Sequence, residues 1–172
     1  MTLDIAREAP PDWMNFSRTV NVAWPDVEAM VLKHRAEIAR DYDLLVAILR
    51  AGSPVAALIA RHTGLPIDYL VCNRRNPRPH FLDGEQRAPR ARRILLVDDV
   101  CGSGWTFARA RQYCEALGNR TGTFSIYRCD GPEMYVPDFS MPAERDTYLR
   151  WPWEYQQETE MPGPAAATMQ AA

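Results

Sequence analysis

Two carboxylates stand beside a run of small residues near the middle of the chain. Asp98 and Asp99 follow the aliphatic residues 94–97, which are typical of a buried strand. Four small residues, 101–104, come next, and a helical pattern begins at 105–106. Such a loop offers an anion backbone N–H groups and the positive end of a helix dipole, and carboxylates suit sugar hydroxyls or magnesium. A single ligand carrying phosphate and ribose would bind to both the loop and the carboxylates. The alternative is an ordinary strand-to-helix turn that binds no ligand.

The composition is that of a globular chain. The 172 residues, 47% of them hydrophobic, suffice for one domain with a substantial core. A net charge of −2 gives no argument for binding to nucleic acid or a membrane. The four cysteines are scattered, so we expect free thiols in a reducing cytosol and no zinc site. No signal-peptide pattern and no stretch of membrane-spanning length is present, so the sequence predicts a cytoplasmic protein.

Strand-like and helix-like stretches alternate along the chain. Strands are expected at 44–49, 67–72, 94–100 and 122–128, and helices from Pro25, at 54–62 and at 106–117. This order predicts an α/β fold with a mostly parallel central sheet flanked by helices. Ligands of such sheets bind beyond the carboxyl ends of the strands. We therefore expect Arg50, Asn73, residues 98–106 and Arg128 along one edge.

Other segments show neither helical nor strand-like periodicity in their apolar residues. Residues 1–20 are expected to be irregular. Residues 73–93 hold seven arginines and several prolines, and we expect a flexible loop with room for a hairpin. Residues 130–156 contain short hydrophobic stretches interrupted by prolines. Residues 157–172 have too little apolar bulk to pack and are expected to be a disordered tail. A single domain over 1–156 follows from this pattern.

Three stretches resemble one family. Residues 93–106 resemble the phosphoribosyl pyrophosphate (PRPP) signature of the type I phosphoribosyltransferases: an aliphatic strand, two acidic residues, a small-residue loop, then glycine and threonine. The Walker loop and the G-x-G-x-x-G fingerprint are absent from this stretch. Residues 49–53 resemble the loop that holds pyrophosphate in that family. Residues 128–131 and 148–154 resemble the hood of the xanthine-guanine and hypoxanthine enzymes, the nearest branch.

The resemblance implies a fold, a reaction and partners. The fold would be that of a type I phosphoribosyltransferase, with the flexible loop at 73–93 and a small C-terminal hood at 129–156. The enzyme, a glycosyltransferase of purine salvage and nucleotide metabolism, would transfer 5-phosphoribose from PRPP to a nucleobase, a 6-oxopurine first, and release pyrophosphate. Magnesium would be the cofactor. The protein would be a homo-oligomer, a dimer or a tetramer, and nucleic acid is not an expected partner.

The resemblance also implies residue roles. Asp98 and Asp99 would be the catalytic pair and would hold magnesium, directly or through water or ribose hydroxyls. The 5′-phosphate would be bound by Cys101, Gly102, Ser103, Gly104, Trp105 and Thr106. Pyrophosphate would be bound by Arg50, Ala51 and Gly52, aided by arginines of the 73–93 loop when it closes. The base would be bound by Arg128, which reads an exocyclic oxygen, and by Tyr148 or Leu149, which stack on its ring.

Two positions depart from the purine branch. Gly102 stands where the 6-oxopurine enzymes usually carry an aspartate that meets N7 of the base. Arg150 stands where guanine and xanthine enzymes often carry an acidic residue, and a guanidinium favours a carbonyl over a 2-amino group. We therefore expect hypoxanthine and xanthine to precede guanine. Gly102 leaves open a PRPP- or nucleotide-binding regulatory protein of the same fold without turnover, and a structural domain with a nucleic-acid-binding basic loop is a further alternative.

Overall fold

The computed structural model describes residues 16–73, 76–129, 135–144 and 147–154. The elements follow in the order β1 (Arg18–Asn21), α1 (Trp24–Asp41), β2 (Leu44–Leu49), α2 (Gly52–Thr63), β3 (Ile67–Asn73), β4 (Asn76–Phe81), a short 3-10 helix (Glu85–Arg87), β5 (Arg93–Cys101), α3 (Trp105–Ala116), β6 (Arg120–Cys129), β7 (Phe139–Ala143) and β8 (Thr147–Arg150). The predicted tail, 157–172, lies outside the described residues.

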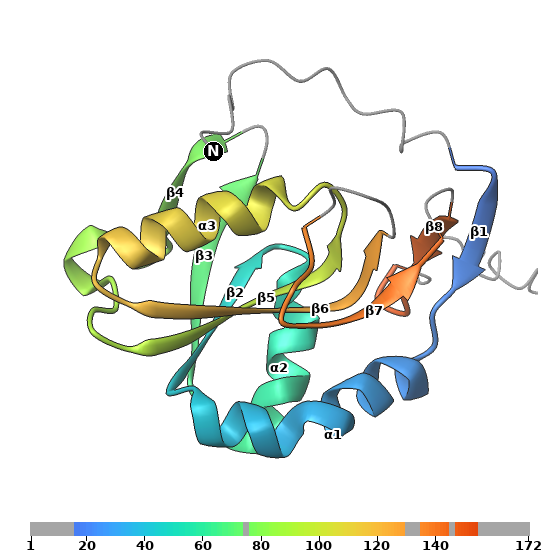
Figure 1. The fold of residues 1–172 in the computed structure, drawn as a ribbon, viewed down its shortest axis with the longest axis horizontal. Helices are drawn as coiled ribbons and strands as arrows, with labels where there is room; N and C mark the ends of the chain where they lie inside the picture. The colour runs from blue at the N-terminus through green and yellow to red at the C-terminus, as the bar shows by residue number, and fades with distance from the viewer. Residues whose placement is uncertain (1–15, 74–75, 130–134, 145–146, 155–172) are drawn as a thin grey trace, which may run out of the picture.

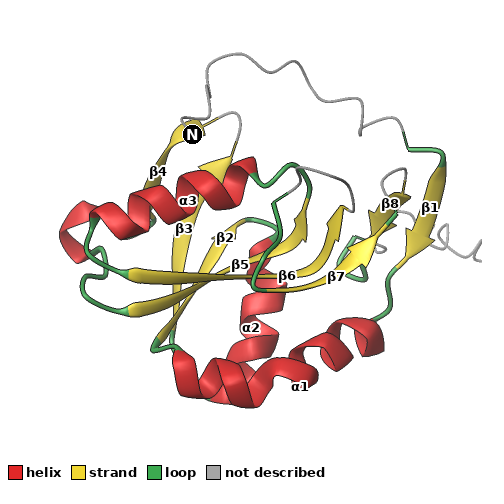
Figure 2. Cartoon of the chain, viewed as in Figure 1, coloured by secondary structure: helices red, strands yellow, loops and turns green. Residues whose placement is uncertain are grey.

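The described strands form one large sheet and one small one. The large sheet has the order β4-β3-β2-β5-β6-β7, and β4 alone runs antiparallel to its neighbour. β1 and β8 pair in parallel as a separate two-stranded sheet. α3 covers one face of the large sheet, and α1 and α2 cover the other (Figures 1 and 2). The predicted α/β fold with a mostly parallel sheet is confirmed.

The central strands are buried on both faces, as parallel strands between helix layers require. Along β2, Leu45 and Ala47 pack in the core shared with α1 and α2. Val46 and Ile48 alternate with them and pack in the other core, with Phe107 of α3. Burying one large aliphatic side chain contributes about 1.5–3 kcal/mol, so the unbroken run of apolar residues in β2 holds both layers on the sheet.

The helix ends follow the local sequence. Asp26 lies in the first turn of α1, and its carboxylate accepts a hydrogen bond from the Ala23 N–H (3.0 Å). Gly64 ends α2 with a φ of 74°, and Gly118 follows α3 with a φ of 84°. Glycine adopts such positive φ angles without a steric penalty. The helices expected at 54–62 and 106–117 therefore end close to their predicted last residues.

The short strands outside the main pattern compare with the sequence prediction as follows. The prediction that residues 1–20 are irregular is wrong for residues 18–20, because β1 pairs with β8. The loop 73–93 contains the hairpin for which the sequence left room: β4 pairs with β3, and the 3-10 helix follows. Within the predicted hood, Phe139–Ala143 joins the large sheet beside β6. These short strands find their partners by tertiary pairing, which local periodicity does not reveal.

No helix in the described ranges is both long enough and apolar enough to cross a membrane.

Candidate active site

The acidic pair lies at the carboxyl end of β5, next to the central strand β2. Asp99 is 6% exposed, and Asp98 is partly buried. The Asp99 N–H donates to Oδ1 of Asp98 (3.0 Å), and the Val100 N–H donates to Oδ1 of Asp99 (2.7 Å). The end of the strand therefore orients both carboxyl groups through its own backbone.

Burial raises the pKa of both carboxyl groups. The pKa of Asp98 lies well above its ordinary value because burial, and then the charge of Asp99, oppose ionisation. Burial raises the pKa of Asp99 to about 6; the Val100 N–H works against that shift, and the charge of Glu154 adds to it. A cation beside the pair would favour the ionised forms and offset part of the cost of desolvation.

Asp98 and Asp99 suit a magnesium site in which the substrate supplies the remaining ligands. Within the described ranges, no group of three His, Cys, Asp or Glu side chains is arranged to hold a metal. Magnesium is commonly bound by one or two carboxylates together with water and phosphate oxygens of a substrate. Asp98 and Asp99 can supply the protein's share of such a ligand set.

The small-residue loop leads directly into α3. Gly104 has a φ of 80° and precedes the first helical residue, Trp105. The Trp105 N–H donates a long hydrogen bond to Oγ of Ser103 (3.4 Å). Backbone N–H groups of the first helical turn have no partner within a helix, and the dipole adds positive charge at this end. The loop and the helix start therefore form a place that suits a phosphate group.

A cavity of about 480 Å³ joins the acidic pair to this loop, within the size range of small-molecule sites. The predicted site residues that line it are Asp98, Asp99, Cys101, Gly102, Ser103, Gly104, Trp105, Thr106, Tyr148 and Leu149. The structure thus brings together the predicted metal, phosphate and hood residues from two distant parts of the chain.

Aromatic rings form another part of the cavity lining, here called the aromatic wall. Phe16 and Tyr148 line it, with their ring centroids 5.3 Å apart. Trp151 also lines it and stacks on Trp153 at 5.0 Å, with an interplanar angle of 4°. Oε2 of Glu154 accepts a hydrogen bond from the Trp151 N–H (3.0 Å), which fixes the end of this wall.

Sequence reasoning missed part of this wall. Phe16 belongs to a segment that was expected to be irregular, and it reaches the cavity because β1 pairs with β8. Glu154 has no predicted role beyond its place at the end of the 148–154 stretch, yet it is a third carboxylate at the cavity. Thr147 and Cys129 also line the cavity. An aromatic residue just before a strand-forming stretch was the available signal for Phe16.

The predicted pyrophosphate loop lies beside the acidic pair but does not line the cavity. Arg50 and Ala51 connect β2 to α2, which begins at Gly52, and the peptide bond before Arg50 is cis. A Cβ on Gly52 would collide with the carbonyl oxygen of Val97 and lie 3.2 Å from Cα of Asp98. Glycine is required there because the start of α2 packs directly on the backbone of β5.

The structure does not bring to the cavity the predicted base contact Arg128 or Arg150, the arginine expected to bias the choice of base. Arg128 lies opposite Cys101 in the β5–β6 pairing and is not among the residues that line the cavity. Burial raises the pKa of the Cys101 thiol to about 12, and the guanidinium of Arg128 works against that shift. Arg150 is likewise absent from the lining, and its carbonyl oxygen accepts a hydrogen bond from the Val22 N–H (2.8 Å).

One arginine assigned to the flexible loop belongs to the opposite edge of the sheet. Arg93 begins β5 and makes two hydrogen bonds to the carboxylate of Asp43, at 2.7 and 3.1 Å. Its Nη1 donates to the carbonyl oxygen of Arg40 (3.1 Å). Arg93 therefore cannot neutralise pyrophosphate at the carboxyl ends of the strands. Residues 74–75, which hold two more of the seven arginines, lie outside the described residues.

Comparison with known proteins shows the family. The model of the phosphoribosyl transferase domain matches residues 24–121, more than half of the chain. This chain belongs to the phosphoribosyl transferase family. The match ends before the hood residues 147–154, so it covers the acidic pair and the phosphate loop but not the aromatic wall.

Individual relatives support the same family. An orotate phosphoribosyltransferase of Sulfurisphaera tokodaii is 29% identical over 106 residues, which are 61% of this chain and 48% of that protein. The chain thus spans about half the length of that relative.

Two solved structures share the fold. A purine phosphoribosyltransferase of Pyrococcus horikoshii has a TM-score of 0.64, 18% identity and coverage of 79% of this chain and 93% of its own. A xanthine-guanine-hypoxanthine phosphoribosyltransferase of Helicobacter pylori has a TM-score of 0.62, 12% identity and coverage of 81% and 96%. The expected type I phosphoribosyltransferase fold is confirmed.

Proposed function

We propose that this protein transfers 5-phosphoribose from PRPP to a nucleobase, with a neutral 6-oxopurine as the preferred acceptor, and releases pyrophosphate. The observation that carries the proposal is the meeting of three features in one cavity of about 480 Å³: an acidic pair, a loop at a helix N-terminus and an aromatic wall. PRPP needs the first two features, and a planar base suits the third.

The chemistry needs no nucleophile from the protein. The bond between the anomeric carbon and a pyrophosphate oxygen breaks, and a ring nitrogen of the base forms the new bond to that carbon. The proton of that nitrogen passes to the released pyrophosphate or to water. Positive charge develops on the ribose, so the enzyme acts mainly by positioning and electrostatic stabilisation. Magnesium, when bound at Asp98 and Asp99, supplies positive charge that stabilises the leaving pyrophosphate.

Each part of the site has one task in this proposal. Asp98 and Asp99 bind the ribose hydroxyls, and their negative charge favours the developing cation. The 101–106 segment holds the 5′-phosphate through N–H groups and hydroxyls. The start of α2 at Gly52, which packs beside Asp98, binds the pyrophosphate. The aromatic wall holds the base and excludes water from the reacting carbon.

The charge of the cavity supports a neutral base. The described residues that line it include the carboxylates Asp98, Asp99 and Glu154 and no Lys, Arg or His. Orotate carries a carboxylate, which these groups would repel. A 6-oxopurine such as hypoxanthine is uncharged and presents a large planar face to Phe16 and Tyr148. For this reason we favour purines, although a relative in the family is an orotate enzyme.

The second candidate is a PRPP- or nucleotide-binding regulator without turnover. It rests on Gly102, which lines the cavity and offers no carboxylate at the place where the purine branch usually carries an aspartate. Binding and turnover separate the two candidates. A regulator binds PRPP with magnesium and releases no pyrophosphate with any base.

The deciding experiment incubates the protein with PRPP, magnesium and one base at a time and measures pyrophosphate release. We expect release with hypoxanthine and none with the double variant Asp98→Asn/Asp99→Asn. Binding of PRPP without release from any base would support the regulator. An absence of PRPP binding would refute the transferase, and an absence of nucleotide binding as well would refute both candidates. A cytoplasmic location and a homo-oligomer, dimer or tetramer, remain predictions; light scattering of the purified protein tests the second.

A further inference from the structure

The phosphate loop has little side-chain bulk with which to fix its own shape. Residues 101–104 are Cys, Gly, Ser and Gly, and Gly104 has a φ of 80°. Glycine changes conformation at low cost, so a glycine loop that must bind phosphate in one shape needs support from its surroundings. The support comes from Tyr135, which lies just before β7 in the sequence.

Tyr135 touches the loop at its end. A Cβ added to Gly104 would collide with Cβ of Tyr135 and lie 2.7 Å from its Cγ. The backbone of Gly104 and the side chain of Tyr135 are therefore in direct contact, with no room for another atom between them. A change in the Gly104 backbone toward the Tyr135 side is blocked by this ring.

Tyr135 also touches the segments on both sides of the loop. Its carbonyl oxygen accepts a hydrogen bond from the Cys101 thiol, with 3.7 Å between Sγ and O. Its ring stacks on Phe107 of the first turn of α3, with centroids 6.0 Å apart and an interplanar angle of 21°. One residue thus contacts the start of the loop, its end and the helix that follows.

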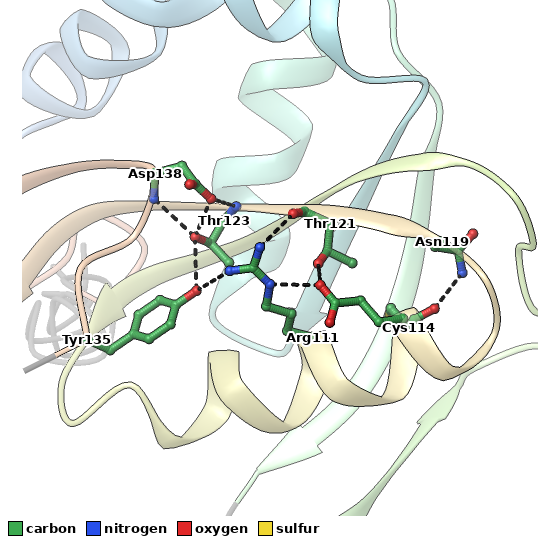
Figure 3. Close-up of polar contacts among 8 residues, drawn as sticks. Arg111, Cys114, Asn119, Thr121, Thr123, Tyr135 and Asp138 are labelled. Carbon is green, nitrogen blue, oxygen red and sulfur yellow. Dashed lines mark hydrogen bonds and ion pairs between the residues drawn. The ribbon is translucent and has the colours of Figure 1, made fainter. Parts of the chain in front are cut away.

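The outer end of Tyr135 is held by α3. Nη1 of Arg111 donates to the Tyr135 hydroxyl (3.3 Å), as Figure 3 shows. The same guanidinium donates to Oε1 of Glu115 (2.9 Å) and to the carbonyl oxygen of Thr121 (3.2 Å). Because Arg111 is held from three directions, it presents a fixed donor to the phenol.

The segment that carries Tyr135 is tied to β6. Oδ2 of Asp138 accepts hydrogen bonds from the Thr123 N–H (2.8 Å) and the Thr123 hydroxyl (2.9 Å). The Asp138 N–H in turn approaches Oγ1 of Thr123 at 3.1 Å, and that oxygen lies 3.5 Å from the Tyr135 hydroxyl (Figure 3). Tyr135 is thus fixed by β6 on one side and by α3 on the other.

We infer that Tyr135 is a positioning residue for the 5′-phosphate subsite: it holds the 101–104 loop in the shape that binds phosphate. Tyr135 does not line the cavity, so it acts through Gly104 and Phe107 and not by touching the substrate. The ring supplies the Cγ contact with Gly104 and the stacking on Phe107, whereas Cβ and the carbonyl oxygen of Tyr135 make the other contacts. This inference rests on the proposed function, in which the loop binds the phosphate of PRPP.

The test compares truncation of two tyrosines that pack along α3. Tyr135→Ala removes the ring beside Gly104, and Tyr135→Phe keeps it. Tyr113→Ala is the matched control, because Tyr113 is on α3 and its ring packs on Phe81 (5.9 Å), away from the loop. We expect Tyr135→Ala to raise KM for PRPP about tenfold, with KM for the base within about twofold of wild type. Tyr135→Phe should restore KM for PRPP to within about threefold of wild type.

Hydrogen exchange supplies a readout that needs no turnover. Backbone amides of residues 101–106 should exchange faster in Tyr135→Ala than in Tyr113→Ala and wild type. Equal exchange in the two alanine variants, or an equal rise in KM for PRPP and for the base, would overturn the inference. If Tyr135→Ala does not fold, Tyr135→Leu takes its place in the same comparison. A wild-type protein that neither binds PRPP nor releases pyrophosphate would refute the proposed function instead, while the exchange result would still decide the role of Tyr135.

Discussion

Gly52 and Val97 meet backbone to backbone where α2 begins against β5. A Cβ on Gly52 would collide with the carbonyl oxygen of Val97 and lie 3.0 Å from its carbonyl carbon. The next residue after Val97 is Asp98, so the start of α2 and the acidic pair share one piece of backbone. Any shift of this contact moves the proposed pyrophosphate loop relative to the proposed metal ligands.

Gly52→Ala should therefore weaken PRPP binding. The added methyl group meets backbone atoms that cannot rotate away, and such overpacking costs about 1–3 kcal/mol. Gly64→Ala is the control at the other end of α2: its φ of 74° strains an alanine, but nothing lies within 4 Å of the added Cβ. Thermal unfolding should show lower stability in both variants. Calorimetry should show weaker PRPP binding in Gly52→Ala alone, and equal binding by both variants would contradict this account.

The acidic pair should make the metal-free protein less stable at higher pH. The pKa of Asp99 is raised to about 6 by burial, so the folded state binds a proton that the unfolded state has already lost. The free energy of unfolding should fall as pH rises from about 4 to about 6, by ~1.4 kcal/mol for each unit of pKa shift. Asp99→Asn removes this penalty, and it should raise the melting temperature above about pH 7 and change it little near pH 4.

The melting measurement uses EDTA, so that no cation compensates for the charge. Asp83→Asn, which removes an exposed carboxylate, serves as the control and should leave the pH profile unchanged. In separate samples with magnesium in place of EDTA, Asp99→Asn should bind PRPP more weakly than wild type. A variant that is no more stable than wild type at about pH 8 would show that burial of Asp99 carries no such penalty.

Tyr148 should affect the base and not PRPP. It lines the cavity and is 40% exposed, so its ring is available to a planar ligand. Loss of one aromatic stacking contact to a base costs about 1–3 kcal/mol, so Tyr148→Ala should raise KM for hypoxanthine about tenfold. Tyr69→Ala is a matched control, because Tyr69 is 37% exposed and does not line the cavity. Similar kinetics for the two variants would remove Tyr148 from the base subsite.

The loop 73–93 should become protected when PRPP binds. Residues 82–92 of this loop follow β4, and their only regular element is the short 3-10 helix. Most of these residues are exposed. Hydrogen exchange there should slow on addition of PRPP and magnesium if the loop closes over the ligand. The amides of α1, on the face of the sheet opposite α3, are an internal reference. Unchanged exchange in 82–92 at saturating PRPP would indicate a basic loop without a role as a lid.

The extent to which the sequence predicts this site depends on how local each signal is. Asp98, Asp99 and the 101–106 segment lie within nine residues of chain, and their residue types alone predict a phosphate and cation site. Arg93 was misassigned because its partner Asp43 lies just before β2, and only the β2–β5 pairing brings the two together. Phe16 is positioned only by the pairing of β1 with β8. Residues whose role depends on such distant pairings leave no mark in local periodicity.

The same limit applies to residues that act through the backbone. Gly104 was identified as part of a small-residue loop, but its contact with Tyr135 depends on how the segment before β7 packs against β6 at Thr123. Arg128 follows an apolar strand and was expected at the base, yet its place opposite Cys101 is outside the cavity lining. The alternation of side chains along a strand changes wherever pairing is irregular, so the face that a strand-end residue occupies is difficult to predict.

The charge of the cavity should set the choice of base. Glu154 lines the cavity, and its charge is close enough to raise the pKa of Asp99, so an anionic base must approach a region of negative potential. We expect a higher kcat/KM for hypoxanthine than for orotate, measured by pyrophosphate release. Glu154→Gln keeps an acceptor for the Trp151 N–H and removes the charge, so it should raise the orotate-to-hypoxanthine ratio of kcat/KM about twofold to fivefold. Glu144→Gln is the control, because Glu144 is an exposed carboxylate that pairs with Arg18 (2.9 Å) and does not line the cavity. If wild-type protein uses orotate better than hypoxanthine, the assignment to a neutral purine is wrong.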